Sequence, residues 1–208
     1  MAADDRPQIT LITPSVLDLD SFPDQLAAVM DRVEIACLRL SLASRDEDLL
    51  GRAADACREV AHARDVAVVI ENHALFVTRH GLDGIHLTDG ARSVRAMRRD
   101  LGPDAIVGAF CGTTRHEGMT AGDAGADYVA FGPIGETTLG HGEPAGFELF
   151  DWWSAMIEVP VIAEGALTRD LIAKFGPVTD FFALGPEIWS TPDPAAALGN
   201  LLTALDQA

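Results

Sequence analysis

Apolar residues along this chain gather into eight short runs, each separated from the next by a stretch of different periodicity. Each run is nearly continuously aliphatic or β-branched, which is how a parallel strand reads when both of its faces are buried. The pattern therefore predicts eight parallel strands. The runs are Gln8–Thr13, Val33–Leu40, Val66–Ile70, Gly84–Leu87, Ala105–Phe110, Asp127–Phe131, Val159–Ala163 and Thr179–Leu184.

The stretches between the runs have helical periodicity. In Asp46–Arg64 and Ala91–Leu101, for example, Ala, Leu, Met and Val recur at helical spacing among charged residues. Strands that alternate with helices pair in parallel through right-handed crossovers. An open doubly wound sheet would share this alternation, but eight units that fill 208 residues without a spare segment favour a closed (β/α)8 barrel. We expect a flexible N-terminus over residues 1–7 and a single TIM-barrel domain over residues 8–208.

The composition fits one cytoplasmic domain. With 208 residues, 48% of them hydrophobic, the chain is long enough to bury about 70% of its unfolded surface. Cys37, Cys57 and Cys111 lack CxxC spacing, so we expect neither a disulfide framework nor a zinc site. The acidic start has no apolar segment of secretory length, and no apolar run approaches the roughly 20 residues of a membrane span.

The charge balance narrows the class of partner. A formal net charge of −17, from 32 acidic and 15 basic side chains, repels nucleic acid and anionic lipid. We therefore expect a small-molecule substrate and neither a nucleic-acid nor a membrane partner. The tandem Trp152 and Trp153 would suit an interface between subunits, where large aromatic side chains are enriched. Packing onto the barrel would explain them equally well, so a homo-oligomer stays open.

The ligand site of such a barrel lies at the carboxyl ends of the strands. In the second run, Cys37, Arg39 and Ser41 share one face, because side chains alternate along a strand. If the other face meets the helices, Arg39 points into the barrel mouth. A buried arginine needs an anionic partner. That partner is either a ligand or a carboxylate such as Glu71 or Glu164, in which case the pair is a structural salt bridge.

The longest connection runs from Gly132 to Gly146 and reads GPIGETTLGHGEPAG. It is far longer and richer in glycine than a short turn after a strand requires, which indicates a mobile flap over the site. Hydroxyls at Thr137 and Thr138 and the imidazole of His141 are positioned to contact a substrate. The alternative is a surface loop with no contact to a ligand.

Four segments carry a resemblance to a known family. They are IENHALFVTRHGLDGIHL at residues 70–87, AGADYVAFGPI at residues 124–134, PAGFELF at residues 144–150 and VIAEGAL at residues 161–167. In register over almost the whole chain, the sequence resembles thiamine phosphate synthase and its relative, the thiazole tautomerase. The resemblance implies a transferase of thiamine biosynthesis that joins a pyrimidine methyl diphosphate to a thiazole phosphate and releases diphosphate with Mg2+.

Residue by residue, the resemblance implies a partly matching site. Arg39 matches the family's arginine of strand two, Asn72 its asparagine after strand three, His86 its histidine of strand four and Gly165 a glycine of its phosphate turn. The candidate catalytic residues are Arg39, Asn72, His73 and His86. The candidate substrate-binding residues are Ser41, Cys111, Thr113, Thr137, Thr138, His141, Glu164, Gly165 and Gly185, and Asp89 is the candidate metal ligand.

The chain departs from the family pattern around the metal and the diphosphate. Cys37 and Ser41 flank Arg39 where the family has glutamine and lysine, so one ammonium group is missing. His73 stands where a metal-binding aspartate is expected. The second metal carboxylate falls near Ala91, with Asp89 as a substitute nearby. The flap also lacks the family's lysine.

Further departures place negative charge where phosphate is expected. Glu164 precedes Gly165 where a neutral residue is usual, and Gly185, Pro186 and Glu187 replace a small hydroxyl-bearing turn. A carboxylate about 4 Å from a phosphate charge costs roughly 4 kcal/mol at an effective dielectric constant near 20. We therefore expect thiamine phosphate synthesis to be inefficient.

Three interpretations follow. The first is a thiamine phosphate synthase that works with a rearranged site. The second is a barrel of the same family that acts on a less charged thiazole or pyrimidine, as a tautomerase or hydrolase would, with His73, His86 or Glu164 as general acid or base. The third is a non-catalytic barrel with a ligand-binding or regulatory role.

Overall fold

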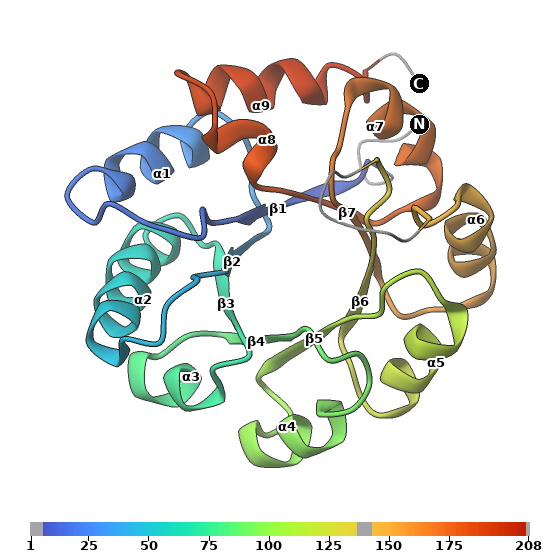
Figure 1. The fold of residues 1–208 in the computed structure, drawn as a ribbon, viewed down its shortest axis with the longest axis horizontal. Helices are drawn as coiled ribbons and strands as arrows, with labels where there is room; N and C mark the ends of the chain where they lie inside the picture. Colours follow the sequence, from blue (N-terminus) through green and yellow to red (C-terminus); the bar gives the residue numbers. More distant parts are fainter. Residues whose placement is uncertain (1–5, 137–142, 207–208) are drawn as a thin grey trace.

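The computed structural model describes residues 6–136 and 143–206, and its strands close into a barrel (Figure 1). All eight strands are parallel and neighbours follow the chain order, with β8 paired to β1. The predicted (β/α)8 barrel is thus confirmed. The strands are β1 Gln8–Ile12, β2 Cys37–Leu40, β3 Ala67–Glu71, β4 Gly84–Leu87, β5 Ile106–Phe110, β6 Tyr128–Phe131, β7 Val161–Glu164 and β8 Phe181–Leu184.

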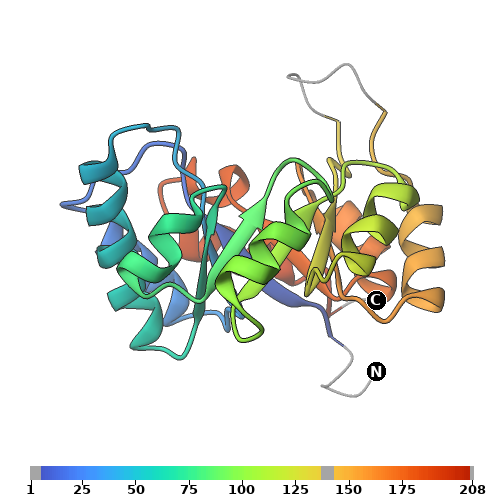
Figure 2. The same cartoon turned by 90° about the horizontal axis from the view of Figure 1, so that it is seen from below.

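Helices surround the barrel as an outer ring, and the side view shows them packed along the strands (Figures 1 and 2). Side chains cap the N-termini of several helices. At the start of α2, for example, Oδ1 of Asp46 accepts hydrogen bonds from the backbone amides of Asp48 and Leu49. The helices are α1 Phe22–Met30, α2 Glu47–His62, α3 Ala74–His80, α4 Val94–Leu101, α5 Arg115–Asp123, α6 Phe147–Met156, α7 Arg169–Phe175, the 3-10 turn Gly176–Val178, α8 Pro186–Trp189 and α9 Pro194–Leu202.

The second strand differs most from its expected length. The run Val33–Leu40 predicted a long strand, but β2 spans only Cys37–Leu40. The amide of Val33 bonds back to the carbonyl of Val29 at the end of α1, so the first residues of the run belong to the turn that follows the helix. An apolar run alone therefore does not show where the strand begins and where the turn before it ends.

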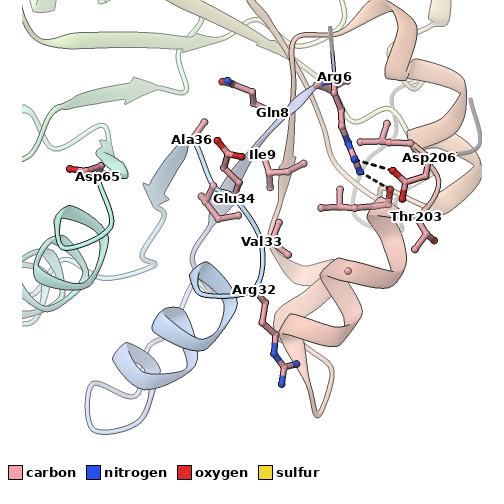
Figure 3. Close-up of a pocket in the computed structure, with 15 residues that line it drawn as sticks. Arg6, Gln8, Ile9, Arg32, Val33, Glu34, Ala36, Asp65, Thr203 and Asp206 are labelled. Atoms are coloured by element: carbon pink, nitrogen blue, oxygen red, sulfur yellow. Dashed lines mark hydrogen bonds and ion pairs between the residues drawn. The ribbon is translucent and has the colours of Figure 1, made fainter. Parts of the chain in front are cut away.

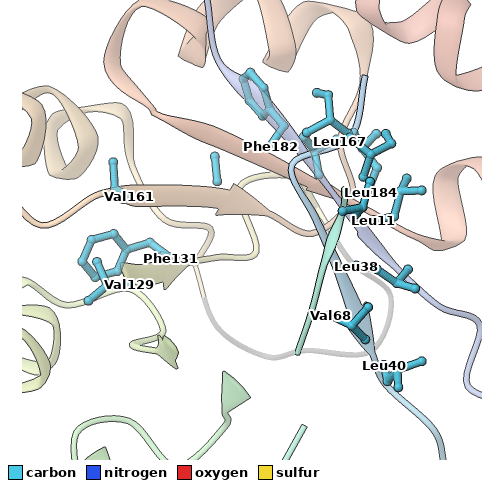
Figure 4. Packing of buried hydrophobic residues seen from close by; sticks show 14 of the residues in the cluster. Leu11, Leu38, Leu40, Val68, Val129, Phe131, Val161, Leu167, Phe182 and Leu184 are labelled. Atoms are coloured by element: carbon cyan, nitrogen blue, oxygen red, sulfur yellow. The ribbon is translucent and has the colours of Figure 1, made fainter. Parts of the chain in front are cut away.

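Alternation along the strands divides the core into two layers. Residues such as Leu11, Leu38 and Val68 point outward and pack under the helices (Figure 4). A second cluster of Ala130, Ile162 and Ala183, with Ile12, Phe110, Tyr128 and Phe181 against it, fills the barrel interior. Arg39 lies between the outward Leu38 and Leu40 in sequence, so its side chain enters the interior.

Aspartates clamp alternate pairs of strands at the amino end of the barrel. Oδ2 of Asp83, just before β4, accepts a hydrogen bond of 2.7 Å from the amide of Val68 in β3, and the amide of Asp83 donates to the carbonyl of Val68. Asp127 and Val107 repeat this pairing between β6 and β5, and Asp180 and Val161 repeat it between β8 and β7. Three pairs of consecutive strands are therefore joined in the same way.

The two ends of the described chain meet at this amino face. Nη1 of Arg6 lies 2.9 Å from Oδ1 of Asp206, and Pro7 is buried. Along residues 6–136 and 143–206, none of the helices combines the length and the apolar character that crossing a bilayer demands.

Candidate active site at the barrel mouth

An arginine held by carboxylates occupies the centre of the barrel mouth. Nη1 of Arg39 donates hydrogen bonds to Oε2 of Glu164 at 2.9 Å and to Nε2 of His86 at 2.8 Å. These partners lie on β7 and β4, so the guanidinium reaches across the interior. Its Nε lies 3.3 Å from Oε1 of Glu71 without the alignment of a hydrogen bond, and it has no other partner among the described residues. The side chain of Arg39 is only 4% exposed.

The electrostatics of this group favour a charged guanidinium. Burial opposes the charge, but Glu164, Tyr128 and Glu71 together outweigh burial, and the pKa of Arg39 is raised above its usual value. Burial also raises the pKa of Glu71, although Arg39 and the hydroxyl of Ser41 oppose that shift. With both glutamates ionised, two carboxylates face one guanidinium, so the cluster has a net charge of −1.

His86 is a neutral link in this network. Arginine only donates, so Nε2 of His86 must accept, and the proton of the neutral ring then sits on Nδ1. Nδ1–H donates to the hydroxyl oxygen of Tyr128 at a distance of 2.9 Å. Burial and the Arg39 guanidinium together hold the pKa of His86 well below its usual value. His86 therefore positions Arg39 and Tyr128 as an uncharged hydrogen-bond bridge.

The charge state of His86 predicts a pH dependence of stability. Below pH 6.5 the unfolded chain binds a proton at this histidine that the folded chain does not bind, so folding loses stability as the pH falls. The loss amounts to about 1.4 kcal/mol for each pH unit below roughly pH 6. We expect the stability advantage of the wild type over His86→Gln to shrink between pH 7.5 and 5.5, as measured by denaturant unfolding. An advantage that is constant over this range would contradict a neutral His86.

Ser41 and Asn72 extend the polar rim. Oγ of Ser41 donates to Oε2 of Glu71 at 2.8 Å, and the amide of Ser41 donates to Oγ1 of Thr13 at 3.0 Å. Nδ2 of Asn72 donates to Oγ1 of Thr88 at 2.8 Å, and its Oδ1 accepts from the amide of Thr88 at 3.1 Å. Asn72 has a φ of 59°, a left-handed conformation that asparagine tolerates better than most residues. Asn72 thus joins the loops that follow β3 and β4.

The candidate metal ligands do not gather around one point. Oδ2 of Asp89 accepts a hydrogen bond of 2.6 Å from Oγ of Ser93 on the same exposed loop. The ring of His73 lies edge-on to Phe76, with 5.7 Å between centroids. Across residues 6–136 and 143–206, no three side chains of His, Cys, Asp or Glu come together as metal ligands would. Neither Asp89 nor His73 therefore belongs to a cluster of three potential ligands within the described part of the chain.

The remaining candidates are separated. Cys111 is buried in the hydrophobic core, where burial raises the pKa of its thiol to about 12, and its Sγ contacts the carbonyl of Ala109 at 3.5 Å. Thr113 is exposed in the loop before α5. Thr137, Thr138 and His141 lie outside the described residues.

Gly165 and Gly185 directly follow β7 and β8, and the carboxylate of Glu187 bridges the two loops that begin there. Gly165 has a φ of 88°, and a Cβ there would lie 2.8 Å from Cβ of Pro133, so the backbone requires glycine. The amide of Gly185 donates to Oε2 of Glu187 at 2.9 Å, and the amide of Leu167 donates to Oε1 of the same side chain at 3.1 Å. One glutamate thus holds both loops.

Sequence reasoning missed the roles of Tyr128 and Glu187. Tyr128 begins β6, and strand alternation puts it on the same inward face as Ala130. The sequence could therefore have predicted that Tyr128 lies in the interior, but its hydrogen bonds were harder to foresee. Its hydrogen bond to His86 could not be predicted from the sequence, because the two residues lie on β6 and β4, which are separated by β5. Glu187 was visible only as a substitution in a turn. Its two amide contacts depend on how two loops meet in space.

A cavity of about 650 Å³ lies at the opposite end of the barrel (Figure 3). It is lined by Gln8 and Ile9 of β1, by the approach to β2 and by residues of α9, and Arg6 and Asp206 pair beside it. Catalytic residues of such barrels come from the carboxyl ends of strands, and the amino end contributes to stability. The mouth, and not this cavity, is therefore the candidate active site.

Comparison with known proteins points in the same direction as the four segments named above. The family model described as thiamine monophosphate synthase matches residues 9–175. The chain is 38% identical over 200 residues to a thiamine-phosphate synthase of Rhodospirillum centenum, covering 93% of this chain and 95% of that one. It is 33% identical over 198 residues to a thiamine-phosphate synthase of Erythrobacter litoralis, covering 91% of each.

A solved structure supports the fold. A thiamine phosphate pyrophosphorylase from Pyrococcus furiosus superimposes with a TM-score of 0.81 at 16% identity, and the match covers 96% of each chain. The resemblance drawn from the sequence is confirmed by the family match and by the two relatives. This chain belongs to the thiamine monophosphate synthase family.

Proposed function

We propose that this protein is an enzyme of thiamine biosynthesis that joins a pyrimidine methyl diphosphate to a thiazole phosphate. In this reaction the bond between the methylene carbon and the diphosphate oxygen breaks, and the thiazole nitrogen bonds to the methylene carbon. The observation that carries the proposal is the 38% identity to a thiamine-phosphate synthase over 93% of this chain. The position of Arg39 at the carboxyl ends of the strands agrees with it.

Arg39 is the residue that we assign to the departing diphosphate. A guanidinium binds phosphate oxygens with parallel hydrogen bonds, and its charge stabilises the leaving group. Its Nη1 is engaged by Glu164 and His86, whereas its Nε and Nη2 make no hydrogen bond among the described residues, and Nε lies buried beside Glu71. Glu164 and Glu71 compete with a diphosphate for this cation, so we expect the reaction to be slow.

Mg2+ enters this proposal through the family resemblance alone. The described residues present no set of three ligands, so we give the metal no protein site and no step. The proposal keeps the metal in the assay as a counter-ion for the diphosphate.

The test uses the purified full chain with both substrates and Mg2+. We expect thiamine phosphate and diphosphate to form in equal amounts, with a turnover below that of efficient synthases. No product above the uncatalysed rate, with thiazole phosphate or with the corresponding thiazole alcohol as acceptor, would refute the synthase proposal, and a turnover equal to that of an efficient synthase would refute its inefficiency.

Ser41→Lys tests the electrostatic reason for that inefficiency. Ser41 contacts Glu71, so a lysine there places an ammonium beside the carboxylate that competes for Arg39. We expect kcat/KM to rise roughly tenfold, which corresponds to about 1.4 kcal/mol of transition-state stabilisation. Ser154→Lys adds the same charge on the exposed surface of α6 and should leave kcat/KM unchanged. Equal effects of the two variants would show that overall charge, and not the mouth, limits the rate.

Two carboxylates already balance the positive charge of Arg39, and this favours a second candidate function. A site whose cation is already paired suits a less charged thiazole or pyrimidine, as a ligand for a tautomerase-like, hydrolase-like or non-catalytic barrel. Thermal-shift measurements distinguish the two. Unphosphorylated precursors that stabilise the chain more than the phosphorylated ones, without any joining reaction, would favour the second candidate.

A further inference from the structure

The two loops that end β7 and β8 present backbone amides to a single acceptor. The amide of Leu167 follows β7 and the amide of Gly185 follows β8, and both donate to the carboxylate of Glu187, at 3.1 and 2.9 Å. Each oxygen of the carboxylate accepts from a different loop. The side chain of Glu187 is only partly exposed, and its contacts lie in the loops that follow the carboxyl ends of β7 and β8.

These loops are the part of a (β/α)8 barrel that frequently binds phosphate, through backbone amides and with glycines that let the anion approach closely. The glycines are present here. A Cβ on Gly185 would lie 3.1 Å from the carbonyl oxygen of Ile12, and Gly165 holds a left-handed φ of 88°. Two oxygens of a carboxylate present acceptors much as two oxygens of a phosphate do. An amide that donates to Glu187 is occupied and does not serve a second anion.

The charges nearby also disfavour an added phosphate. Glu164 directly precedes Gly165, and its carboxylate is bound to Arg39. Among residues 6–136 and 143–206, no lysine or arginine forms an ion pair with Glu187. A phosphate at these loops would face the carboxylate of Glu187, and Arg39 is already shared between Glu164 and Glu71.

We propose that Glu187 is a specificity-determining residue whose carboxylate fills the anion subsite of the barrel, so that the preferred acceptor is the unphosphorylated thiazole alcohol. This inference rests on the proposed function. The step balances without a phosphate on the acceptor: the carbon–oxygen bond to the diphosphate breaks, the leaving group takes the electron pair, and the thiazole nitrogen donates its lone pair to the methylene carbon. The product is a thiazolium alcohol, and no further reactant is needed.

The first experiment measures anion binding without any turnover. Glu187→Ala frees both amides, so inorganic phosphate should raise the Tm of this variant by at least about 3 °C and leave the wild type unchanged. Glu187→Gln keeps the size of the side chain and should respond in the same direction if the alanine variant does not fold. Asp193→Ala is the matched control, because Asp193 also accepts a backbone amide, that of Ala196, but at the start of α9. Its Tm should not respond to phosphate.

The second experiment compares acceptors with the pyrimidine methyl diphosphate held constant. We expect the wild-type kcat/KM for the thiazole alcohol to equal or exceed that for thiazole phosphate, and Glu187→Gln to shift this ratio at least tenfold toward the phosphate. A wild type that prefers the phosphate more than a hundredfold, or a Glu187 variant that gains no phosphate response, would overturn the inference. If neither acceptor reacts, the proposed function fails, and the Tm measurements still decide whether Glu187 fills an anion subsite.

Discussion

Arg39→Met is expected to destabilise the barrel by about 3–5 kcal/mol, because removal of one partner of a buried ion pair leaves the other charges without compensation. In the variant Glu164, whose side chain is 14% exposed, and Glu71 would face each other in the interior. Nε2 of His86 would also lose its donor. Denaturant unfolding at pH 7 measures the effect as a fall in the unfolding free energy with an unchanged slope.

Two further variants separate the buried pair from arginine in general. Arg64→Met removes the pair with Asp31 on the outer surface and should change the unfolding free energy only within error. Combining Arg39→Met with Glu164→Gln removes a charge from each side and should recover part of the loss. If Arg39→Met is no more harmful than Arg64→Met, Arg39 does not compensate buried charge.

Trp153→Ala is expected to destabilise the protein by about 3–5 kcal/mol, the usual range for truncation of a buried tryptophan. Trp153 is 1% exposed, and its ring lies 5.1 Å from that of Phe131, centroid to centroid. Its Nε1–H donates to the carbonyl of Val159 at 2.7 Å. The variant would therefore open a cavity between α6 and the barrel and leave that carbonyl without its donor. Thermal and denaturant unfolding both measure the loss.

Trp152 is the natural control for Trp153. It is only partly buried, and the guanidinium of Arg115 lies 4.6 Å from the centroid of its ring. A contact of this kind contributes about 0.5–1 kcal/mol at an exposed site, so Trp152→Ala should have a much smaller effect. Similar losses for the two variants would contradict this division of the tandem pair, and a change in oligomeric state with Trp152→Ala would place that ring in a subunit interface.

The fold was predictable from sequence because parallel strands buried on both faces leave a continuous apolar run. Alternation along the second strand likewise predicts that Arg39 faces inward, and the need of a buried arginine for an anion predicts a partner such as Glu71 or Glu164. The structure shows both carboxylates around one guanidinium. Sequence alone left open whether a ligand or the protein itself supplies the anion.

The finer features of the site depend on distances between strands. The bridge from Arg39 through His86 to Tyr128 joins three strands, and no local pattern encodes it. Cys111 follows β5 directly, so the sequence placed it at the mouth, whereas its side chain turns into the core. Side chains alternate between the two faces of a strand, so a shift of one residue at the end of β5 decides whether Cys111 faces the mouth or the core.

The aspartate clamps at the amino end suggest how the cylinder is divided. Asp83, Asp127 and Asp180 each join two strands that are consecutive in the chain, and each clamp encloses one intervening helix. The chain therefore contains three closed modules of strand, helix and strand in succession. New termini placed between modules, for example in the connection after β4, would leave every clamp whole, whereas a cut between β5 and β6 would divide one. We therefore expect circular permutation to be tolerated best in the connections that no aspartate clamp spans.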